Sequence, residues 1–348
     1  MRVLVGLSGG VDSSVAAALL LEGGHEVVGA TMKLWGGAGD SGCCSVGDVE
    51  DARRVAARLG IDHHVFNFSE EFEQMVVEPY AEAHALGRTP NPCIECNRHL
   101  KFRRFLDRAL RLGFEAVATG HHARVANDPV TQEPRLLRGR DIAKDQSYVL
   151  SMLTVGELAR VLLPVGEMTK RDVRVRAAAM GLPTAAKPDS QEVCFVAAGA
   201  GSGPRQRFLA ERIELHPGRL VEHTTGAVVG TVPAVELVTV GQRRGLGLSA
   251  PGRRYALEVD AASATVVVGP EEDLLTDHVE LTSRTWVSDP LPIGALALAQ
   301  ASAHGRARPV RLTETGVVYL EGPDRRVAPG QTVAIYVGDR VVGSGTAA

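Results

Sequence analysis

Short apolar runs alternate with longer amphipathic segments along residues 1–125, the pattern of a parallel β-sheet covered by helices. Four apolar runs predict buried strands, at 2–7, 25–34, 63–68 and 114–120. Two amphipathic segments predict helices, at 48–60 and 69–87. In a parallel sheet of this kind ligands lie beyond the carboxyl ends of the strands, so the loops that follow these strands are where a site is expected.

After about residue 205 the pattern changes to short β-rich segments broken by glycine and proline. The stretch at 201–206, GSGPRQ, is the best linker candidate. We therefore expect an α/β catalytic domain over 1–204, a small β-rich central domain over 205–272 and a C-terminal β-barrel domain over 273–348.

The first predicted strand leads directly into SGGVDS at 8–13, and a helical pattern begins near Asp12. Glycines let a backbone approach phosphate oxygens, serines supply hydroxyl donors, and a helix N-terminus favours an anion. The spacing has neither the lysine of GxxxxGK[ST] nor the glycines of GxGxxG. The alternative is a plain turn, since such residues are common in turns. The loop resembles the pyrophosphate loop of ATP pyrophosphatases, which implies cleavage between the α and β phosphates of ATP.

The composition is that of an ordinary globular chain of 348 residues with 45% hydrophobic content, large enough for two or three domains. No apolar run approaches the ~18 residues of a membrane span, so we expect a cytoplasmic protein with no membrane association. The five cysteines are an odd number and argue against a disulfide framework. They leave reactive thiols or a metal as alternatives.

The net charge of −3 gives no global sign of nucleic-acid binding, so any RNA site is local. Basic residues recur at helical spacing in two segments and as a pair in a third: Lys101, Arg103, Arg104, Arg108 and Arg111; Lys170, Arg171, Arg174 and Arg176; and Arg243 with Arg244. Each set is able to line a phosphate path. The alternative is that they are solvated faces of helices.

Two cysteines lie in segments suited to chemistry. In TPNPCIECN at 89–97, prolines and asparagine predict a loop before a helix that starts near Asn97, which places Cys96 at the helix N-terminus. The helix dipole and nearby cations would lower the pKa of that thiol and supply a nucleophilic thiolate. In KPDSQEVCFV at 187–196, Cys194 follows a polar loop in a strand-like segment.

Structural zinc is the alternative for the first of these segments, because Cys93, Cys96 and His99 form a CxxCxxH spacing. A fourth ligand is hard to find, since Cys43 and Cys44 are adjacent rather than two residues apart. Pairing Cys96 with Cys194 is the more economical interpretation, and two thiols near an ATP site indicate sulfur chemistry.

Six ordered motifs together resemble the tRNA-specific 2-thiouridylases: 6–17, 89–97, 118–124, 144–150, 187–195 and 239–247. The resemblance implies an adenine nucleotide α-hydrolase-like fold and a tRNA-uridine sulfurtransferase. It implies catalysis by Cys96 and Cys194. It implies ATP binding by Gly6, Leu7, Ser8, Gly9, Gly10, Val11, Asp12, Ser13, Met32 and Gly120. It also implies contact with the target base by Asn91, Pro92 and Cys93, and with tRNA by Lys144, Asp145 and Gln146.

The same resemblance implies a reaction. The C2 oxygen of the wobble uridine is adenylated by ATP, with Mg²⁺ on the phosphates and no resident metal. A persulfide on Cys194, loaded by a sulfur donor protein, then supplies the sulfur for 2-thiouridine. Cys96 either attacks the persulfide to release sulfide or resolves it as a Cys96–Cys194 disulfide. The anticodon region of tRNA is the expected partner, with the base splayed into the pocket.

The chain departs from the family pattern at two places. Cys93 stands where some members have an acidic residue, which removes a general acid or base. In the barrel, Ser302 and Ala303 stand where the family has a tRNA contact, and Arg306 or Arg308 is the candidate substitute. Two other functions compete: an amidating or ligating relative that needs no cysteine pair, and an ATP-responsive RNA-binding module whose thiols hold zinc.

Overall fold

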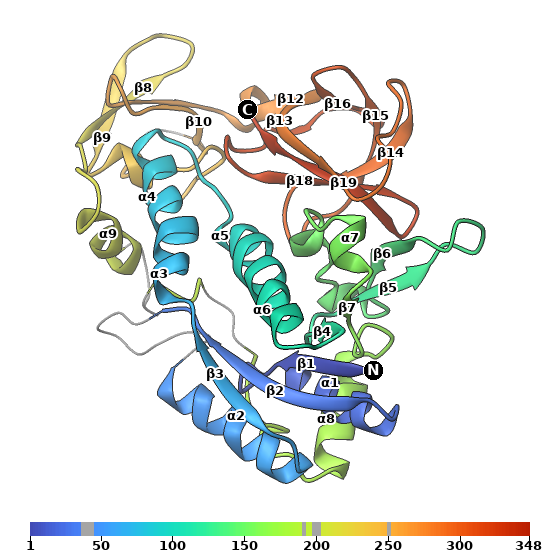
Figure 1. Ribbon diagram of the computed structural model, residues 1–348. Helices are drawn as coiled ribbons and strands as arrows, with labels where there is room; N and C mark the ends of the chain where they lie inside the picture. The colour runs from blue at the N-terminus through green and yellow to red at the C-terminus, as the bar shows by residue number, and fades with distance from the viewer. Residues whose placement is uncertain (36–44, 190–192, 197–202, 249–251) are drawn as a thin grey trace.

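A computed structural model describes residues 1–35, 45–189, 193–196, 203–248 and 252–348. The N-terminal part is built on a five-stranded sheet with all pairs parallel, in the order β3-β2-β1-β4-β7 (Figure 1). Its strands are β1 (Arg2–Gly6), β2 (Glu26–Lys33), β3 (His63–Asn67), β4 (Ala116–Ala118) and β7 (Val161–Leu162). This confirms the predicted α/β domain with a parallel sheet.

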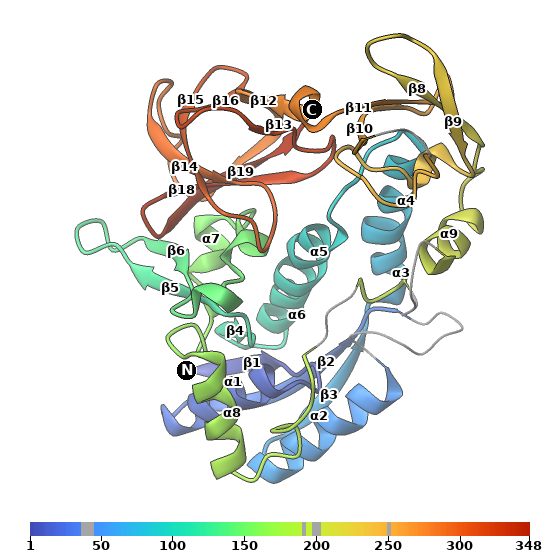
Figure 2. The ribbon, with the colours of Figure 1, turned by 180° about the vertical axis from the view of Figure 1, so that it is seen from behind.

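Alternate residues of β1 face opposite sides of the sheet, as the period of two in a strand requires. Val3 and Val5 pack with α1 (Val11–Glu22) and α2 (Val46–Leu59), whereas Leu4 belongs to the larger core on the other side. All three side chains are fully buried. The sheet therefore has helices on both faces, which Figures 1 and 2 show from opposite sides.

The helices on the second face run in two nearly continuous rods. The first rod comprises α3 (Ser69–Phe72), the π-helical η1 (Glu73–Val77) and α4 (Glu78–Ala85). The second comprises α5 (Pro92–Glu95), the π-helical η2 (Cys96–Arg104) and α6 (Phe105–Arg111). Further helical segments are η3 (Ile142–Lys144), η4 (Ser147–Leu150), α7 (Val155–Leu158), α8 (Lys170–Ala179) and α9 (Gly203–Ala210). No helix in the described ranges is long and apolar enough to cross a membrane.

The central part is a four-stranded sheet in the order β10-β11-β8-β9, closed over its own small core. Its elements are β8 (Gly218–Glu222), β9 (Val228–Val232), η5 (Val235–Leu237), β10 (Tyr255–Asp260), β11 (Thr265–Gly269) and η6 (Glu271–Leu274). A short pair, β12 (Leu275–Thr276) with β17 (Asp324–Arg325), lies between this sheet and the last domain.

The C-terminal part is a six-stranded antiparallel barrel. Its strands are β13 (His278–Trp286), β14 (Leu296–Gln300), β15 (Arg308–Leu312), β16 (Gly316–Tyr319), β18 (Thr332–Val337) and β19 (Arg340–Ala347). The order β13-β16-β15-β14-β18-β19 is closed by pairing of β13 with β19. The predicted β-rich domain and barrel are confirmed.

The barrel shares a sheet with the N-terminal domain. The hairpin of β5 (Ala123–Asn127) and β6 (Pro134–Arg138) extends the barrel sheet, because Leu137 pairs with Arg340 of β19. Next to this pairing, the Asp145 carboxylate accepts hydrogen bonds from Arg138 Nη1 at 2.8 Å and from Ser147 Oγ at 2.8 Å. Arg138 Nη2 also donates to Gln300 Oε1 of β14 at 2.9 Å, and the Tyr148 hydroxyl donates to the Thr332 carbonyl of β18 at 2.8 Å, so polar groups join two domains that are far apart in sequence.

Candidate active site

The loop between β1 and α1 is a compact hydrogen-bonded turn at the carboxyl edge of the sheet. Ser13 Oγ lies 3.1 Å from Ser8 Oγ, accepts from the Ser8 backbone N–H at 3.2 Å and donates to the Gly10 carbonyl at 3.1 Å. Gly10 caps α1, which begins at Val11, one residue before the predicted start. The loop thus combines the N-terminus of α1 with two serine hydroxyls, which are features that favour an anion.

Two glycines of the site are required by close backbone contacts. Gly9 has φ +70°, and a Cβ there would lie 2.4 Å from the carbonyl oxygen of Asp48 in α2. A Cβ on Gly120 would lie 2.4 Å from the backbone N of Ser13. Met32, at the end of β2, reaches within 3.3 Å of the Cβ position of Gly6. The structure therefore brings the residues predicted to bind ATP to one edge of the sheet.

Asp12, in the first turn of α1, has two cationic or potentially cationic neighbours. Lys170 Nζ lies 2.6 Å and 2.7 Å from its two carboxylate oxygens, and His122 Nε2 lies 3.1 Å away. Burial acts to raise the pKa of Asp12, but these contacts outweigh it, so the pKa is lowered. Asp12 is therefore ionised and its charge is balanced locally.

The segment that leads to Cys194 is attached at two points. Lys187 Nζ pairs with Asp48 at 2.7 Å and Asp51 at 2.6 Å, both on α2. Asp189 pairs with Lys144 at 3.0 Å, Lys170 at 2.9 Å and Arg174 at 2.8 Å, a set of three cations. Burial acts to raise the pKa of Asp189, and the bonds from Lys170 and Lys144 reverse this and lower the pKa to about 2.

These contacts link polar groups from four of the sequence motifs, and the short chain segment from Lys144 to Gln146 closes them into a ring. Gln146 Oε1 accepts from the His122 backbone N–H at 2.8 Å, and His122 contacts Asp12. We call this set the charge ring; its members are Asp12, Lys170, Asp189, Lys144, Gln146 and His122. It connects the loop at 8–13 to the start of the Cys194 segment.

Cys96 does not lie at a helix N-terminus as predicted. The helix begins at Pro92, and Asn91 caps it by accepting a hydrogen bond from the Cys93 backbone N–H at 3.1 Å. Cys96 is the fifth helical residue, beyond the first turn in which the helix dipole acts strongly. Arg98, one of the cations that follow Cys96 in the sequence, pairs with Glu95 at 3.3 Å. The sequence does contain a signal for this earlier helix start, because asparagine followed by proline is typical of the beginning of a helix.

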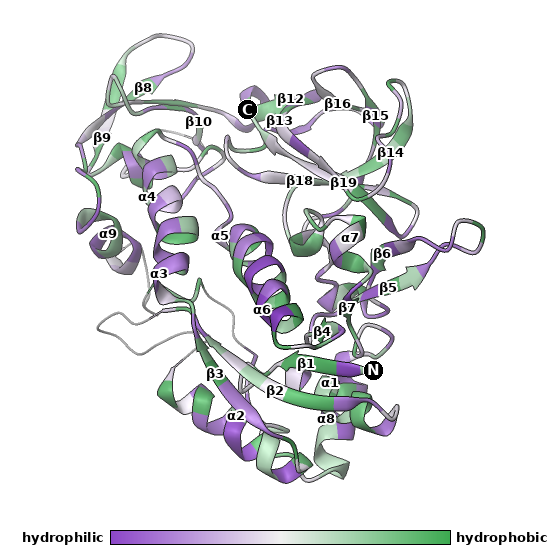
Figure 3. Ribbon diagram, viewed as in Figure 1, coloured by the Kyte–Doolittle hydropathy of each residue, from purple (hydrophilic) through white to green (hydrophobic). Residues whose placement is uncertain are grey.

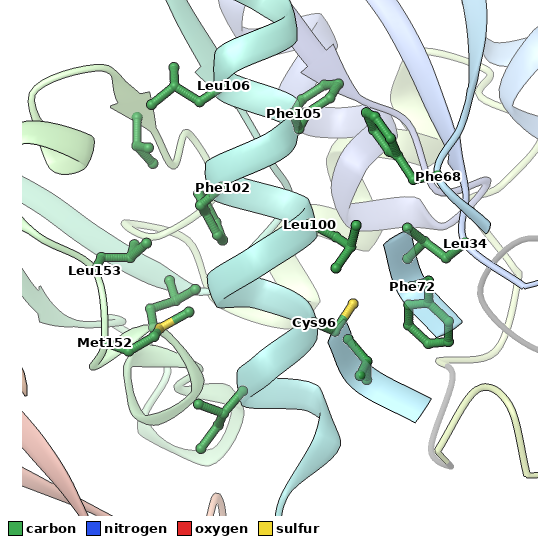
Figure 4. Close-up of a cluster of buried hydrophobic side chains, with 14 of the residues drawn as sticks. Leu34, Phe68, Phe72, Cys96, Leu100, Phe102, Phe105, Leu106, Met152 and Leu153 are labelled. Carbon is green, nitrogen blue, oxygen red and sulfur yellow. The ribbon is translucent and has the colours of Figure 1, made fainter. Parts of the chain in front are cut away.

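Cys96 is instead a buried member of the large core, only 6% exposed. Figure 4 shows its sulfur on the same side of the helix as Leu100, turned toward Leu34 and Phe72. Cys194 is half-buried and packs against the same core. The structure therefore brings the two predicted catalytic cysteines to one apolar region.

Cys194 lies in a turn rather than in the strand-like segment predicted, with Val196 N–H bonded to the Val193 carbonyl at 3.0 Å. The adjacent Phe195 inserts into an aromatic cluster. Its ring centroid lies 5.1 to 6.1 Å from those of its four neighbours, Phe208, Tyr80, Phe72 and Trp35. Ring packing of this kind fixes the position of the turn that carries Cys194.

The residues predicted to contact the base and tRNA differ in exposure. Cys93 and Gln146 are exposed, Asn91 and Lys144 are half-buried, and Pro92 is buried as the first residue of α5. Asp145 is also buried. Gly139 N–H, Ser147 N–H, Ser147 Oγ and Arg138 Nη1 all donate to its carboxylate. This geometry favours a structural role for Asp145.

The basic segments separate into paired and exposed groups. Lys170 and Arg174 make internal ion pairs, and Arg176 pairs with Glu22. By contrast, four arginines of η2 and α6 are exposed: Arg103, Arg104, Arg108 and Arg111. Figure 3 shows hydrophilic residues along the visible side of this rod. Sequence reasoning missed the role of Lys170, whose partners lie far away in the chain.

In the ranges that the structure describes, no group of three or more histidine, cysteine or acidic residues is placed to hold a metal ion. His99 pairs with Glu95 at 3.2 Å. Cys43, Cys44 and Ser190 lie outside the described residues. In the barrel, the half-buried Arg308 lies 3.6 Å from Asp324, and the exposed Arg306 lies 3.9 Å from Glu321.

Comparison with known proteins agrees with this architecture. A family model described as a tRNA methyl transferase HUP domain matches residues 1–198. A PRC-barrel domain model of tRNA methyl transferase matches 206–270, and an aminomethyltransferase beta-barrel domain model matches 280–347.

The relatives are similar over nearly the full chain. A tRNA-specific 2-thiouridylase MnmA from Chloroflexus aggregans is 46% identical, covering 99% of this chain and 97% of the relative. The protein of the same name from Thermobifida fusca is 44% identical, covering 100% and 96%. Among solved structures, a 4-thiouridine synthetase in complex with RNA and ATP matches 61% of this chain and 50% of that chain, with 18% identity and a TM-score of 0.37. On the sequence relatives and the domain models, the chain belongs to the family of tRNA-specific 2-thiouridylases.

Proposed function

We propose that this chain is an ATP-dependent sulfurtransferase that converts the wobble uridine of tRNA to 2-thiouridine. Relatives named for that activity match 99% and 100% of this chain. The observation that supports it in the structure is that both cysteines pack against one large core, while the charge ring connects the loop at 8–13 to the Cys194 segment.

In the first step, the loop at 8–13 binds the phosphates of ATP. The C2 oxygen of uridine attacks the α-phosphorus, an O–P bond forms, and pyrophosphate leaves. This step is needed because a carbonyl oxygen flanked by ring nitrogens is a poor leaving group. Mg²⁺ that accompanies the triphosphate would offset the phosphate charge, and Asp12, which is ion-paired with Lys170, is the carboxylate of this loop.

In the second step, sulfur from a Cys194 persulfide forms the bond to C2 and AMP leaves. The Cys96 thiolate attacks the Cys194 sulfur, which breaks the S–S bond and leaves a Cys96–Cys194 disulfide. The terminal sulfur leaves Cys194 either as hydrosulfide, which then attacks C2, or already bound to C2, so that the 2-thiouridine base is freed from the enzyme. An external thiol then reduces the disulfide, and a persulfide donor protein reloads Cys194.

The anticodon region of tRNA is the proposed partner. The four exposed arginines of η2 and α6 continue directly from the helix that carries Cys96, so a phosphate backbone bound there would lie near the thiols. The exposed position of Cys93, three residues before Cys96, is consistent with a contact to a base that has left its stack.

The test is nucleoside mass spectrometry on unmodified tRNA with ATP, Mg²⁺ and a protein persulfide donor. AMP formation is followed in parallel. We expect Cys194→Ser to form AMP on tRNA but no 2-thiouridine from the persulfide donor, because it lacks the carrier sulfur but keeps the nucleotide loop. Free sulfide is run as a second source, since it bypasses the carrier.

Two results would contradict the proposal. Loss of AMP formation in a folded Cys194→Ser protein would show that the cysteine is needed for adenylation as well. Release of AMP with another acceptor, without any thiolated base, would favour an amidating or ligating enzyme.

A further inference from the structure

Thr89 lies where all three domains meet. Its backbone N–H donates to the Pro329 carbonyl at 2.8 Å, and its own carbonyl accepts from Gln331 Nε2; both partners lie beside β18 of the barrel. Its hydroxyl donates to Thr239 Oγ1 of the central domain at 3.2 Å. The polar groups of this one residue are therefore divided between the two accessory domains.

The chain around Thr89 is also packed tightly against both domains. Gly330 has φ +90°, and a Cβ there would lie 3.3 Å from Thr89 N. Gly87 has φ +70°, and a Cβ there would lie 3.1 Å from the Val259 carbonyl of β10. Any side chain at either glycine would push the loop away, so both contacts are close backbone approaches.

The position of Thr89 is transmitted over a short, stiff connection. Pro90 and Pro92 fix their φ angles, and Asn91 between them caps α5. From Pro92 the helix continues into η2, whose first residue is Cys96. A shift at Thr89 would therefore move Asn91 and Cys96 together.

This contact gives a role to the motif at 239–247, which the proposed chemistry leaves without one. Thr239 is its first residue, and the Thr239 backbone N–H donates to Gln242 Oε1 at 3.1 Å. Gln242 is in turn paired through its carbonyl with Ala256 N–H of β10 at 2.9 Å. The motif thus holds the Thr239 hydroxyl in place against Thr89.

We propose that Thr239 and Gln331 are positioning residues for sulfur transfer, through which the two accessory domains set the loop that carries Asn91 and Cys96. This inference rests on the proposed function for what Cys96 does. Neither residue contacts the reacting atoms in this arrangement. Removing the side-chain contacts of Thr239 and Gln331 with Thr89 is expected to reduce kcat. The loop at 8–13, at the carboxyl edge of the parallel sheet, should bind ATP as before.

The experiment compares the full chain with Thr239→Val, which removes the hydroxyl at nearly constant volume, and with Thr239→Val combined with Gln331→Met. Four quantities are measured: kcat and KM for tRNA thiolation, the dissociation constant of ATP, and the alkylation rate of Cys96 resolved by peptide mass spectrometry. We expect kcat to fall about tenfold or more in the double variant, because small displacements of reacting groups cost that much. The Cys96 alkylation rate should change while ATP affinity stays the same.

Two controls accompany these variants. Thr239→Ser restores the hydroxyl and should restore kcat. Thr231→Val makes the same substitution at an exposed position of β9 and should behave as the unmodified chain. If the double variant does not fold, the single Thr239→Val substitution tests the same contact.

The proposal is overturned if the folded variants keep the original kcat and Cys96 alkylation rate, or if their loss of activity follows a loss of ATP affinity. Failure of the proposed function has a different signature. The unmodified chain would then form no 2-thiouridine, while the Cys96 alkylation rate would still respond to Thr239→Val.

Discussion

Replacing Asp145 by asparagine should weaken the joint between the N-terminal domain and the barrel. The Asp145 side chain is 5% exposed and that of Arg138 is 12% exposed, so this ion pair is screened little by solvent. Arg138 also donates to Gln300 Oε1 at 2.9 Å and stacks 3.7 Å from the ring centre of Tyr336. The neutral amide would place an N–H group against a guanidinium donor. Breaking one side of a buried ion pair typically costs about 3–5 kcal/mol.

Thermal unfolding of the full chain measures this effect. A loss of that size corresponds to a fall in the first unfolding midpoint of roughly 6–20 °C. Adding Arg138→Met should destabilise less than the sum of the two single changes, because it removes the uncompensated charge. Asp107→Asn, on the exposed side of α6, is the control and should leave the midpoint unchanged. An unchanged midpoint together with weaker tRNA binding would refute the structural role and restore the predicted contact with tRNA.

Two further outcomes follow from the structure. Gly9→Ala should weaken ATP binding about tenfold or more, because its φ of +70° and the 2.4 Å approach of the Asp48 carbonyl leave no place for a methyl group. ATP affinity is measured by calorimetry, with Gly47→Ala, where the nearest atom is 3.7 Å away, as the control. Equal affinities of the two variants would contradict the role of the loop. Burial lowers the pKa of His84 to about 4, so its contribution to stability is complete above pH 6.5 and is lost as the pH falls toward 4. Between pH 7 and pH 5 the free energy of unfolding of the unmodified chain, measured in urea, should fall by about 2 kcal/mol more than that of His84→Gln. If the two free energies change with pH in parallel, His84 does not cause this pH dependence.

The sheet and its nucleotide loop are predictable from the sequence because their signals are local. Apolar runs such as β1 alternate with amphipathic helices, and the SGGVDS loop follows β1 directly. The same holds for the barrel, where short alternating strands are separated by turn residues. Local patterns are therefore sufficient to predict these strands and helices, and the edge of the sheet at which the ligand is expected.

The charge ring was not predictable, because its contacts join distant positions. Lys170 and Asp12 are separated by 158 residues, and nothing in the composition of α8 distinguishes Lys170 from the solvated arginine beside it. Asp145 illustrates the same limit: it is buried and paired with Arg138, whose guanidinium contacts Gln300 and Tyr336 of a domain that begins more than a hundred residues later. Tertiary electrostatics, rather than local propensity, decides both cases.

The pairing of β6 with β19 has a consequence for biosynthesis. Leu137 leaves the ribosome about 200 residues before its partner Arg340, which at ~5–20 residues per second is a delay of roughly 10–40 s. During that interval the outer edge of β6 presents unsatisfied backbone groups, a surface prone to pairing with another chain. Aggregation is therefore the greatest risk when the N-terminal domain has been made and the barrel has not. Before β19 emerges, a chaperone would protect this edge, and slow translation would prolong its exposure.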